Sequence, residues 1–194
     1  DLDHRPLQAG LARLRDYRHW RAREIARRLE RHGIPEPYEG ARSYARGTII
    51  SRTHFAQHLV ALGRAGSVRE VFKHYLVSGR PGHVHGEWAG LEEAVGWIRG
   101  AGGQAVIAHP ARYKLTATKL RELISDFQDL GGEGIEVVSG SHGRDEVLAM
   151  AAHARRSGLL ASVGSDFHGP GNAFVELGAV APLPDGCRPV WSAW

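Results

Sequence analysis

Short apolar runs alternate with helix-like segments in the second half of the sequence, and this alternation limits the folds available to the chain. The runs cover residues 105–108, 135–138 and 159–163. Each follows a stretch in which apolar side chains recur three and four positions apart, as in an amphipathic helix. Such alternation predicts a parallel sheet covered by helices, either an open α/β sheet or part of a (β/α) barrel. The predicted helices run through 91–98, 120–127 and 147–154, and a last short strand is expected at 173–177.

The first part of the sequence carries helical signals only. Apolar residues recur with helical spacing, and serines at positions 51 and 67 are placed to cap two further helices. A segment rich in glycine and proline then separates this part from the alternating pattern. We therefore predict two domains, a helical one over 1–80 and an α/β one over 81–194. The predicted helices span 8–32, run from Ser51 to Gly63 and start again at Ser67, and the connector covers 79–86.

Charge is divided unevenly between these two parts. Residues 1–80 hold 16 Lys and Arg against 8 Asp and Glu, whereas residues 81–194 hold 9 against 13. A basic lobe attracts polyanions and is typical of nucleic-acid binding, although an arginine-rich helix can also be a solvated face.

Composition narrows the protein class further. No apolar run approaches the length of a membrane span, and the N-terminus has no signal-peptide pattern, so we expect a cytoplasmic protein without membrane contact. The single cysteine, Cys187, leaves only histidine and carboxylate for a metal site. The chain opens on Asp1 and its one methionine is Met150, so the sequence is expected to be part of a longer protein.

Polar, metal-competent residues follow the three apolar runs directly. His109 follows the first run, His142 comes soon after the second, and Asp166 and His168 follow the third. The carboxyl ends of parallel strands meet on one face of a sheet, so these side chains are expected to form one site. Imidazole and carboxylate together suit Mn, Zn, Fe or Mg. The alternatives are a capping role for Asp166 and a core role for His109.

Glu136 lies inside the second run, between two apolar neighbours. Alternation allows two positions for its side chain. It could point into a barrel interior, where it would bind a metal or support a ligand, or it could point outward and form an ion pair beneath a helix. Periodicity leaves both positions open.

Several motifs in order resemble the PHP (polymerase and histidinol phosphatase) phosphoesterases, and most closely their ribonuclease AM subgroup, which includes 3′,5′-nucleoside bisphosphate phosphatases. The motifs are Val-Ile-Ala-His-Pro-Ala-Arg-Tyr at 106–113, Gly-Ser-Asp-Phe-His at 164–168 and Ser-Arg-Thr-His-Phe-Ala at 51–56. The similarity extends to the two ends of the chain, at 1–4 and 189–194.

The resemblance implies the C-terminal part of a distorted (β/α)7 barrel, interrupted by an all-helical insertion domain over 1–80. It also implies two or three divalent metal ions, usually Mn²⁺. His109 and Asp166 would be metal ligands, and His168 a ligand or a phosphate contact able to carry a proton. Arg52 and His54, at a helix N-terminus that itself favours anions, would bind substrate phosphate. Arg112 is a further candidate for bidentate phosphate binding.

One departure from the family pattern stands out. PHP proteins carry an N-terminal His-x-His motif and further ligands in their first strands, and this sequence does not. His83-Val84-His85 has the spacing, but it lies in the connector and is interpreted as coincidence. We therefore expect a missing N-terminal barrel segment and an incomplete site in this chain alone.

The expected function of the intact protein is metal-dependent phosphoester hydrolysis. The substrates that the resemblance implies are RNA degraded 5′→3′ and small 3′,5′-bisphosphonucleotides. Tyr44, Phe55 or Trp88 could stack a base, although core packing is the more expected use of Phe55. Two alternatives are a non-catalytic RNA-binding module and a PHP phosphatase acting on a small non-nucleotide phosphate ester.

Overall fold

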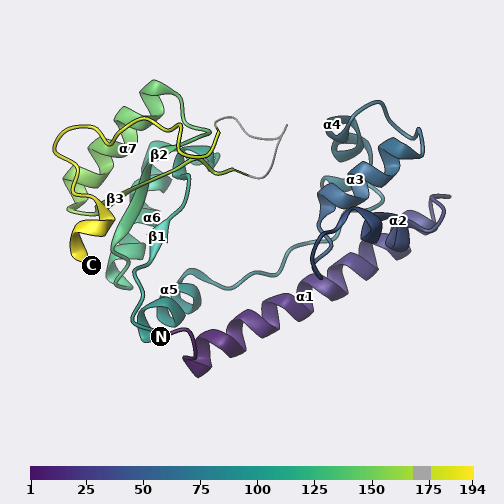
Figure 1. Cartoon of the computed structure of the whole chain (residues 1–194), viewed down its shortest axis with the longest axis horizontal. Helices are drawn as coiled ribbons and strands as arrows, with labels where there is room; N and C mark the ends of the chain where they lie inside the picture. The colour runs from purple at the N-terminus through teal and green to yellow at the C-terminus, as the bar shows by residue number, and fades with distance from the viewer. Residues whose placement is uncertain (168–175) are drawn as a thin grey trace. The chain divides into compact units, whose positions relative to one another are not determined.

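The structure is a computed structural model, and it describes residues 1–167 and 176–194. It divides into two compact units (Figure 1). A helical unit comprises Gln8–Ala89, and a sheet unit comprises Asp1–Leu7 with Gly90–Trp194. No helix of the described residues is both long and apolar enough to cross a membrane.

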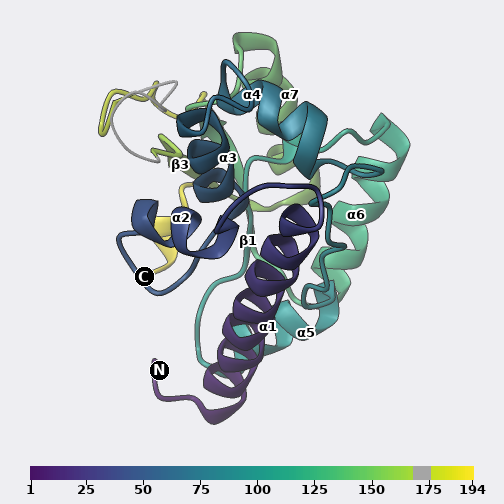
Figure 2. The same cartoon turned by 90° about the vertical axis from the view of Figure 1, so that its right-hand side faces the viewer.

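The helical unit is built around the second half of a long helix. Helix α1, Arg5–Glu30, is one continuous rod in both views (Figures 1 and 2). Its buried face includes Ile25 and Leu29, whereas its first half is largely exposed. Gly33, in the left-handed conformation, turns the chain, and the Ile34 N–H returns to the Leu29 carbonyl at 3.2 Å. This end matches the predicted glycine stop.

Helices α3 and α4 of this unit begin where the sequence predicted, whereas α2 was not among the predicted helices. Ser51 precedes α3, and the hydroxyl of Ser67 accepts the Glu70 N–H at 3.2 Å before α4. Phe55 and Leu59 of α3 are fully buried in the core of the unit. The elements are α2 (Pro37–Tyr44), α3 (Arg52–Ala61), α4 (Val68–Val71) and a π-helical turn (Phe72–Leu76).

An extended strap formed by residues 83–85 lies against α1. Arg28 donates a hydrogen bond to the carbonyl of His83, Arg21 to that of Val84 and Tyr17 to that of His85. The side chain of Val84 is buried in the same core. These three carbonyls are not part of a sheet, and side chains of α1 donate their hydrogen bonds instead. These bonds fix the path of the strap. The His83-Val84-His85 motif belongs to this strap.

The sheet unit contains three parallel strands in the order β1-β2-β3. Helices α5, α6 and α7 pack beside them around one apolar core (Figure 2). The predicted parallel sheet with intervening helices is thus confirmed. The elements are α5 (Leu91–Gly100), β1 (Val106–Ile107), the 3₁₀ turn η2 (Pro110–Arg112), α6 (Ala117–Asp129), β2 (Gly134–Ser139), α7 (Arg144–Ser157), β3 (Leu160–Gly164) and the 3₁₀ turn η3 (Val190–Ala193).

The pairing of β2 with β3 contains an irregularity near the candidate site. Glu136 pairs with Ser162, but the next pair is Val138 with Val163, so Val137 is an extra residue on β2. Bulges of this kind re-aim side chains and are common next to active sites. The last strand expected, at 173–177, falls mostly outside the described residues.

Candidate functional site

The two firmest candidate ligands both have a left-handed backbone. His109 follows β1 with φ 35°, and Asp166 follows β3 with φ 52°. Outside glycine, this conformation is uncommon and costs free energy, and it concentrates at functional sites. Glu36 is the one other non-glycine residue with positive φ in the described chain, and it precedes α2 in the helical unit. The ends of two strands in the sheet are therefore held in unusual turns.

Glu136 lies on β2, the strand between β1 and β3, and it is half-buried. Its carboxylate accepts a hydrogen bond from the backbone N–H of His109. Burial raises the pKa of Glu136, and the negative charge of Asp166 adds to this rise. The His109 N–H and the nearby rings of His109 and His142 act in the opposite direction. Glu136 therefore lies in the middle of β2, one residue beyond the last pair of β1 with β2, where its carboxylate contacts the turn at His109.

Two histidine rings at these strand ends have a buried nitrogen without a hydrogen-bond partner among the described residues. They are Nδ1 of His109 and Nε2 of His142. The carbonyl of Val137 lies 3.1 Å from Nδ1 of His142 and can only accept, so Nδ1 is the donor of this bond and Nε2 is the ring nitrogen left for another partner. Metal-binding histidines are commonly fixed by such a bond to a carbonyl. A buried ring nitrogen that lacks a partner is one that a ligand can satisfy.

Two glycines keep the strand ends close together. A Cβ atom on Gly140 would lie 2.1 Å from the carbonyl oxygen of Ser165, the residue before Asp166. A Cβ atom on Gly164 would lie 3.1 Å from Oε1 of Glu136. The Gly140 N–H donates to the Gly164 carbonyl at 3.0 Å, so the loop after β2 supports the turn that carries Asp166.

The donor types at the strand ends suit a hard divalent cation, but the set is incomplete. Within 1–167 and 176–194, no three His, Cys, Asp or Glu side chains are placed so that they could hold one metal ion. His168, predicted as a ligand or phosphate contact, lies outside the described residues. Arg112 is exposed at the end of η2, three residues after His109. The described strand ends are therefore a candidate for part of a metal site.

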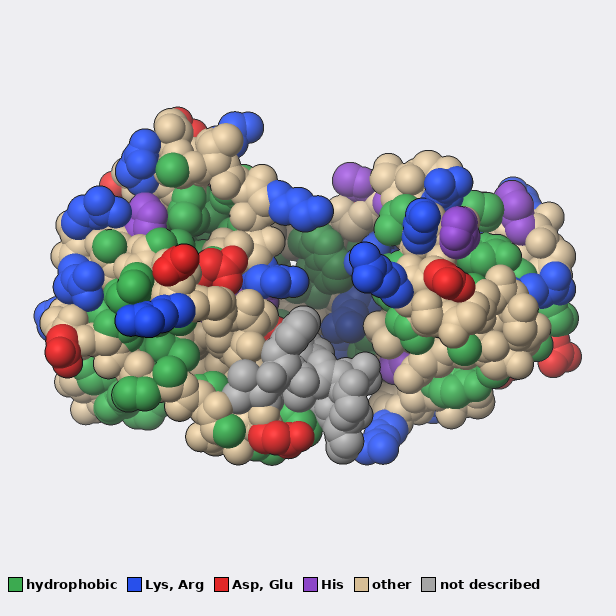
Figure 3. Space-filling view, turned by 90° about the horizontal axis from the view of Figure 1, so that it is seen from above, with side chains coloured by type: hydrophobic (Ala, Val, Ile, Leu, Met, Phe, Trp, Pro, Cys, Tyr) green, Lys and Arg blue, Asp and Glu red, His purple; other side chains and the backbone are tan. Residues whose placement is uncertain are grey.

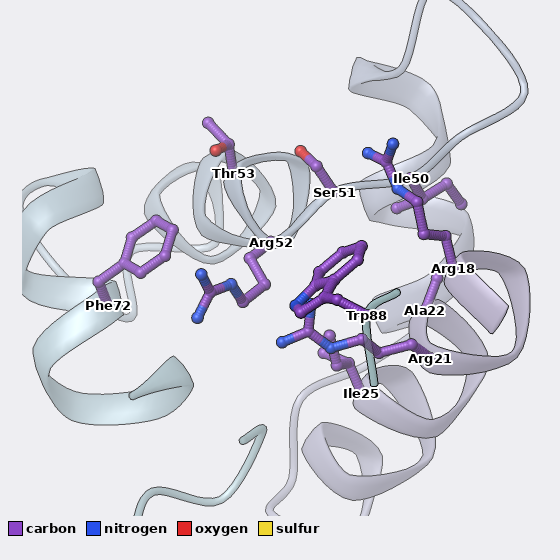
Figure 4. Close-up of a pocket in the computed structure, with 10 residues that line it drawn as sticks. All are labelled: Arg18, Arg21, Ala22, Ile25, Ile50, Ser51, Arg52, Thr53, Phe72 and Trp88. Atoms are coloured by element: carbon purple, nitrogen blue, oxygen red, sulfur yellow. The ribbon is translucent and has the colours of Figure 1, made fainter. Parts of the chain in front are cut away.

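A second candidate site is a pocket of about 240 Å³ in the helical unit (Figure 4). Arg52 comes from the first turn of α3, and Arg18 and Arg21 come from α1. The side chains of Arg52 and Arg21 reach into the space beside the Trp88 indole (Figure 4). No acidic residue is among those that line the pocket in the described chain. The lining residues are Arg18, Arg21, Ala22, Ile25, Ile50, Ser51, Arg52, Thr53, Phe72 and Trp88.

The positive charges in this pocket repel one another. Burial lowers the pKa of Arg21, and Arg52 and Arg18 lower it further. The pKa of His83 is also lowered, first by burial and then by Arg21 and Arg52. Lys, Arg and His side chains are frequent on the face of the helical unit that Figure 3 shows, and acidic ones are sparse there. An anion in the pocket would relieve this repulsion.

The predicted phosphate residues Arg52 and His54 differ in their surroundings. The Arg52 guanidinium lies in the pocket, 5.5 Å from the centre of the Phe72 ring. His54 does not line the pocket: its Nδ1 accepts the Ser51 N–H at 3.1 Å and thereby caps α3. Burial lowers the pKa of His54, so the ring is neutral near pH 7 with its proton on Nε2.

Sequence reasoning missed Arg18 and Arg21 as pocket residues. They lie three positions apart on α1 and therefore face the same side of that helix. The helical spacing of arginines was visible in the sequence, but the contact of this face with Trp88, far along the chain, was not. His142 was noted after the second apolar run but not chosen as a site residue.

Comparisons with known proteins agree with the motifs. The sequence is 51% identical over 186 residues to a 3′,5′-nucleoside bisphosphate phosphatase of Chromobacterium violaceum, covering 95% of this chain and 65% of that protein. It is 40% identical over 191 residues to a 5′-3′ exoribonuclease of Haemophilus influenzae, covering 98% of this chain and 69% of the relative. A solved Chromobacterium violaceum structure, described as an amidohydrolase with bound sulfate and no metal, matches with a TM-score of 0.88. The two sequences are 50% identical, and the match covers 97% of this chain and 66% of the chain in that structure.

No known family profile matches the sequence. The chain spans about two thirds of the length of the curated relatives that it matches. Identity at this level, together with the shared fold, shows the family directly. The chain belongs to the family of bacterial 5′-3′ exoribonucleases and 3′,5′-nucleoside bisphosphate phosphatases, the PHP subgroup that its motifs resemble.

Proposed function

We propose that the protein containing this chain is a metal-dependent phosphoesterase that acts on nucleotides. Its substrates are RNA degraded from the 5′ end, small 3′,5′-bisphosphonucleotides, or both. The observation that carries the proposal is the position of Glu136, whose half-buried carboxylate accepts the His109 N–H and is close enough to Asp166 for the two negative charges to repel. The names of the relatives, one a phosphatase and one an exoribonuclease, support the same reaction class.

At the strand ends, His109 and Asp166 would hold a divalent ion, with further ligands, His168 among the candidates, from outside the described residues. When bound, such an ion supplies Lewis-acid stabilisation of charge on the phosphoryl oxygens. Glu136 acts by accepting the His109 N–H, which keeps the left-handed turn at His109 in place. Nε2 of His142 offers one more lone pair at the same edge. The manganese identity of the metal and the number of ions stay predictions.

In the helical unit, the arginine pocket binds the charged part of a nucleotide. Guanidinium groups form charge-assisted, bidentate hydrogen bonds to phosphate, and three of them line this pocket. The Trp88 indole beside them offers a flat apolar surface to a base. His54, which caps α3 through Nδ1, could donate to an anion only from Nε2.

The reaction class is tested by turnover with the full-length protein and added Mn²⁺. We expect release of phosphate from a 3′,5′-bisphosphonucleotide or of mononucleotides from 5′-phosphorylated RNA. Faster hydrolysis of a sugar or amino-alcohol phosphate would replace the nucleotide assignment with the small-ester alternative. Salt-sensitive RNA binding without any turnover would support the non-catalytic RNA-binding module instead.

A further inference from the structure

Three aromatic side chains form a continuous series along the edge of the arginine pocket. The centre of the Tyr17 ring lies 6.2 Å from that of the Trp88 ring, edge to face, and 5.4 Å from that of the Trp20 ring, in a tilted arrangement. Trp88 itself lines the pocket and lies 5.9 Å from the Arg21 guanidinium. The series therefore runs from the pocket outward, in the order Trp88, Tyr17, Trp20.

This aromatic series is held in place but remains open to solvent. Tyr17 is fixed at its hydroxyl, which donates to the carbonyl of His85 in the strap. The two tryptophans are not part of the core, because Trp20 is 53% exposed and Trp88 is 58% exposed. Exposing two indoles, both neighbours of the Tyr17 ring, costs solvation free energy, and such a surface is typical of a binding site.

The neighbouring charges indicate what covers this surface. Arg18 and Arg21 alternate with Tyr17 and Trp20 on one stretch of α1, so the aromatic rings and the cationic groups share one edge of the helix. A surface that combines flat aromatic rings with arginines matches single-stranded nucleic acid, whose bases stack and whose backbone is anionic. An apolar protein partner would not require the three arginines of the adjacent pocket.

We propose that Trp88, Tyr17 and Trp20 form a stacking platform for unpaired bases of an RNA chain. On this assignment, the arginine pocket takes the terminal nucleotide, and the platform takes the bases that follow it. The inference rests on the proposed function and goes beyond it, because it assigns to Trp20 the preference for RNA over a mononucleotide. A mononucleotide bound in the pocket does not extend to Trp20, which is not among the lining residues.

The other aromatic candidates do not belong to this platform. Phe55 is fully buried in the helical core, which excludes the base stacking considered from the sequence. Tyr44, at the end of α2, is 40% exposed but does not belong to the series of ring contacts among the described residues. Tyr44 therefore serves as a matched control: an exposed aromatic of the same unit, outside the platform.

The test compares two substrates of the full-length protein, a 5′-phosphorylated RNA pentanucleotide and a 3′,5′-bisphosphonucleotide. For Trp20→Ala we expect kcat/KM for the pentanucleotide to fall by about 5- to 100-fold, the loss of one stacked base. Hydrolysis of the bisphosphonucleotide should stay within about twofold of wild type, because its binding does not involve the platform. Trp20→Phe should restore most of the RNA activity, and Tyr44→Ala should change neither substrate.

Three results separate failure of the inference from failure of the proposed function. Equal loss on both substrates, or no loss on RNA, would overturn the platform and leave the enzyme assignment intact. If the wild-type protein turns over neither substrate, the proposed function fails, and the platform is then tested by anisotropy of a labelled RNA. In that measurement, unchanged RNA affinity in the Trp20→Ala protein overturns the platform, and weakened affinity supports it. Thermal unfolding of each variant shows that the comparison is between folded proteins.

Discussion

The backbone N–H of His109 donates a hydrogen bond to the carboxylate of Glu136, which joins the end of β1 to the neighbouring strand β2. The bond lies at a residue whose backbone is left-handed and therefore unfavourable in isolation. Glu136 thus has a positioning role that does not depend on its charge, because a neutral amide oxygen would accept the same N–H.

We predict that Glu136→Gln keeps activity within about threefold of wild type. Glu136→Ala should lower it by about tenfold or more, because it removes the carboxylate that accepts the N–H of the half-buried residue His109. Steady-state kinetics of both variants, with metal content measured alongside, check this. If Glu136→Gln loses bound metal as fully as Glu136→Ala, Glu136 is a ligand and the positioning role is wrong.

Gly140 controls the position of the turn that carries Asp166. Alanine at this site would place Cβ 2.1 Å from the Ser165 carbonyl oxygen, a contact that only backbone movement can relieve. We predict that Gly140→Ala weakens metal binding and activity by about tenfold or more, because small displacements of an active-site group lower rates strongly. Gly96→Ala on α5 is the control, since its Cβ meets nothing within 4 Å, and it should leave both measurements unchanged.

Arg52 should contribute to substrate binding rather than to folding. Removing one guanidinium that pairs with phosphate costs about 1.5–3 kcal/mol, so Arg52→Ala should raise KM by about 10- to 100-fold. Arg46→Ala, an exposed arginine of the same unit outside the pocket, should behave as wild type. An unchanged KM in Arg52→Ala would show that the pocket does not bind the substrate phosphate.

Glu24 links the stability of α1 to acid pH. Hydrogen bonds from Arg27 and Arg28 lower the pKa of Glu24 from 4.5 to about 2. Because the folded-state pKa lies below the ordinary value, this stabilisation is complete above pH 4.5 and is lost as the pH falls toward 2.

Thermal unfolding should therefore show Glu24→Gln less stable than wild type at pH 6, with the difference shrinking as the pH falls to 3. The expected difference is less than about 1 kcal/mol, because the side chains of Arg27 and Arg28 are 48% and 41% exposed. Glu30→Gln on the same helix is the control, because its carboxylate forms no hydrogen bond or ion pair within the described residues. A difference that grows toward acid pH would contradict this assignment.

Much of the fold followed from sequence because it depends on local pattern. The strands predicted at 105–108, 135–138 and 159–163 match β1, β2 and β3, and the caps at Ser51 and Ser67 are where spacing placed them. Periodicity and capping act over a few residues, so a sequence records them directly. The closed barrel, the insertion and the cytoplasmic location stay predictions.

The features that sequence reasoning missed depend on contacts between distant segments. The hydrogen bond from His109 to Glu136 joins residues that are 27 positions apart in the sequence. The capping bond of His54 and the strap formed by residues 83–85 likewise require side chains to meet carbonyl or N–H groups that no local pattern specifies. The bulge at Val137 depends on the register of two strands, which three apolar runs do not determine.

The central claim, that Asp166 and the strand ends hold a catalytic metal, is tested most directly by one measurement. The full-length protein and Asp166→Asn are purified without chelator, and metal content and hydrolysis of a 3′,5′-bisphosphonucleotide are measured on the same samples. Asp129→Asn, an exposed aspartate at the end of α6, is the matched control. We predict that wild type and Asp129→Asn contain a divalent transition metal and turn over substrate, and that Asp166→Asn loses both. Full activity of Asp166→Asn, or an active wild-type protein that contains no metal and is indifferent to chelator, would contradict the account.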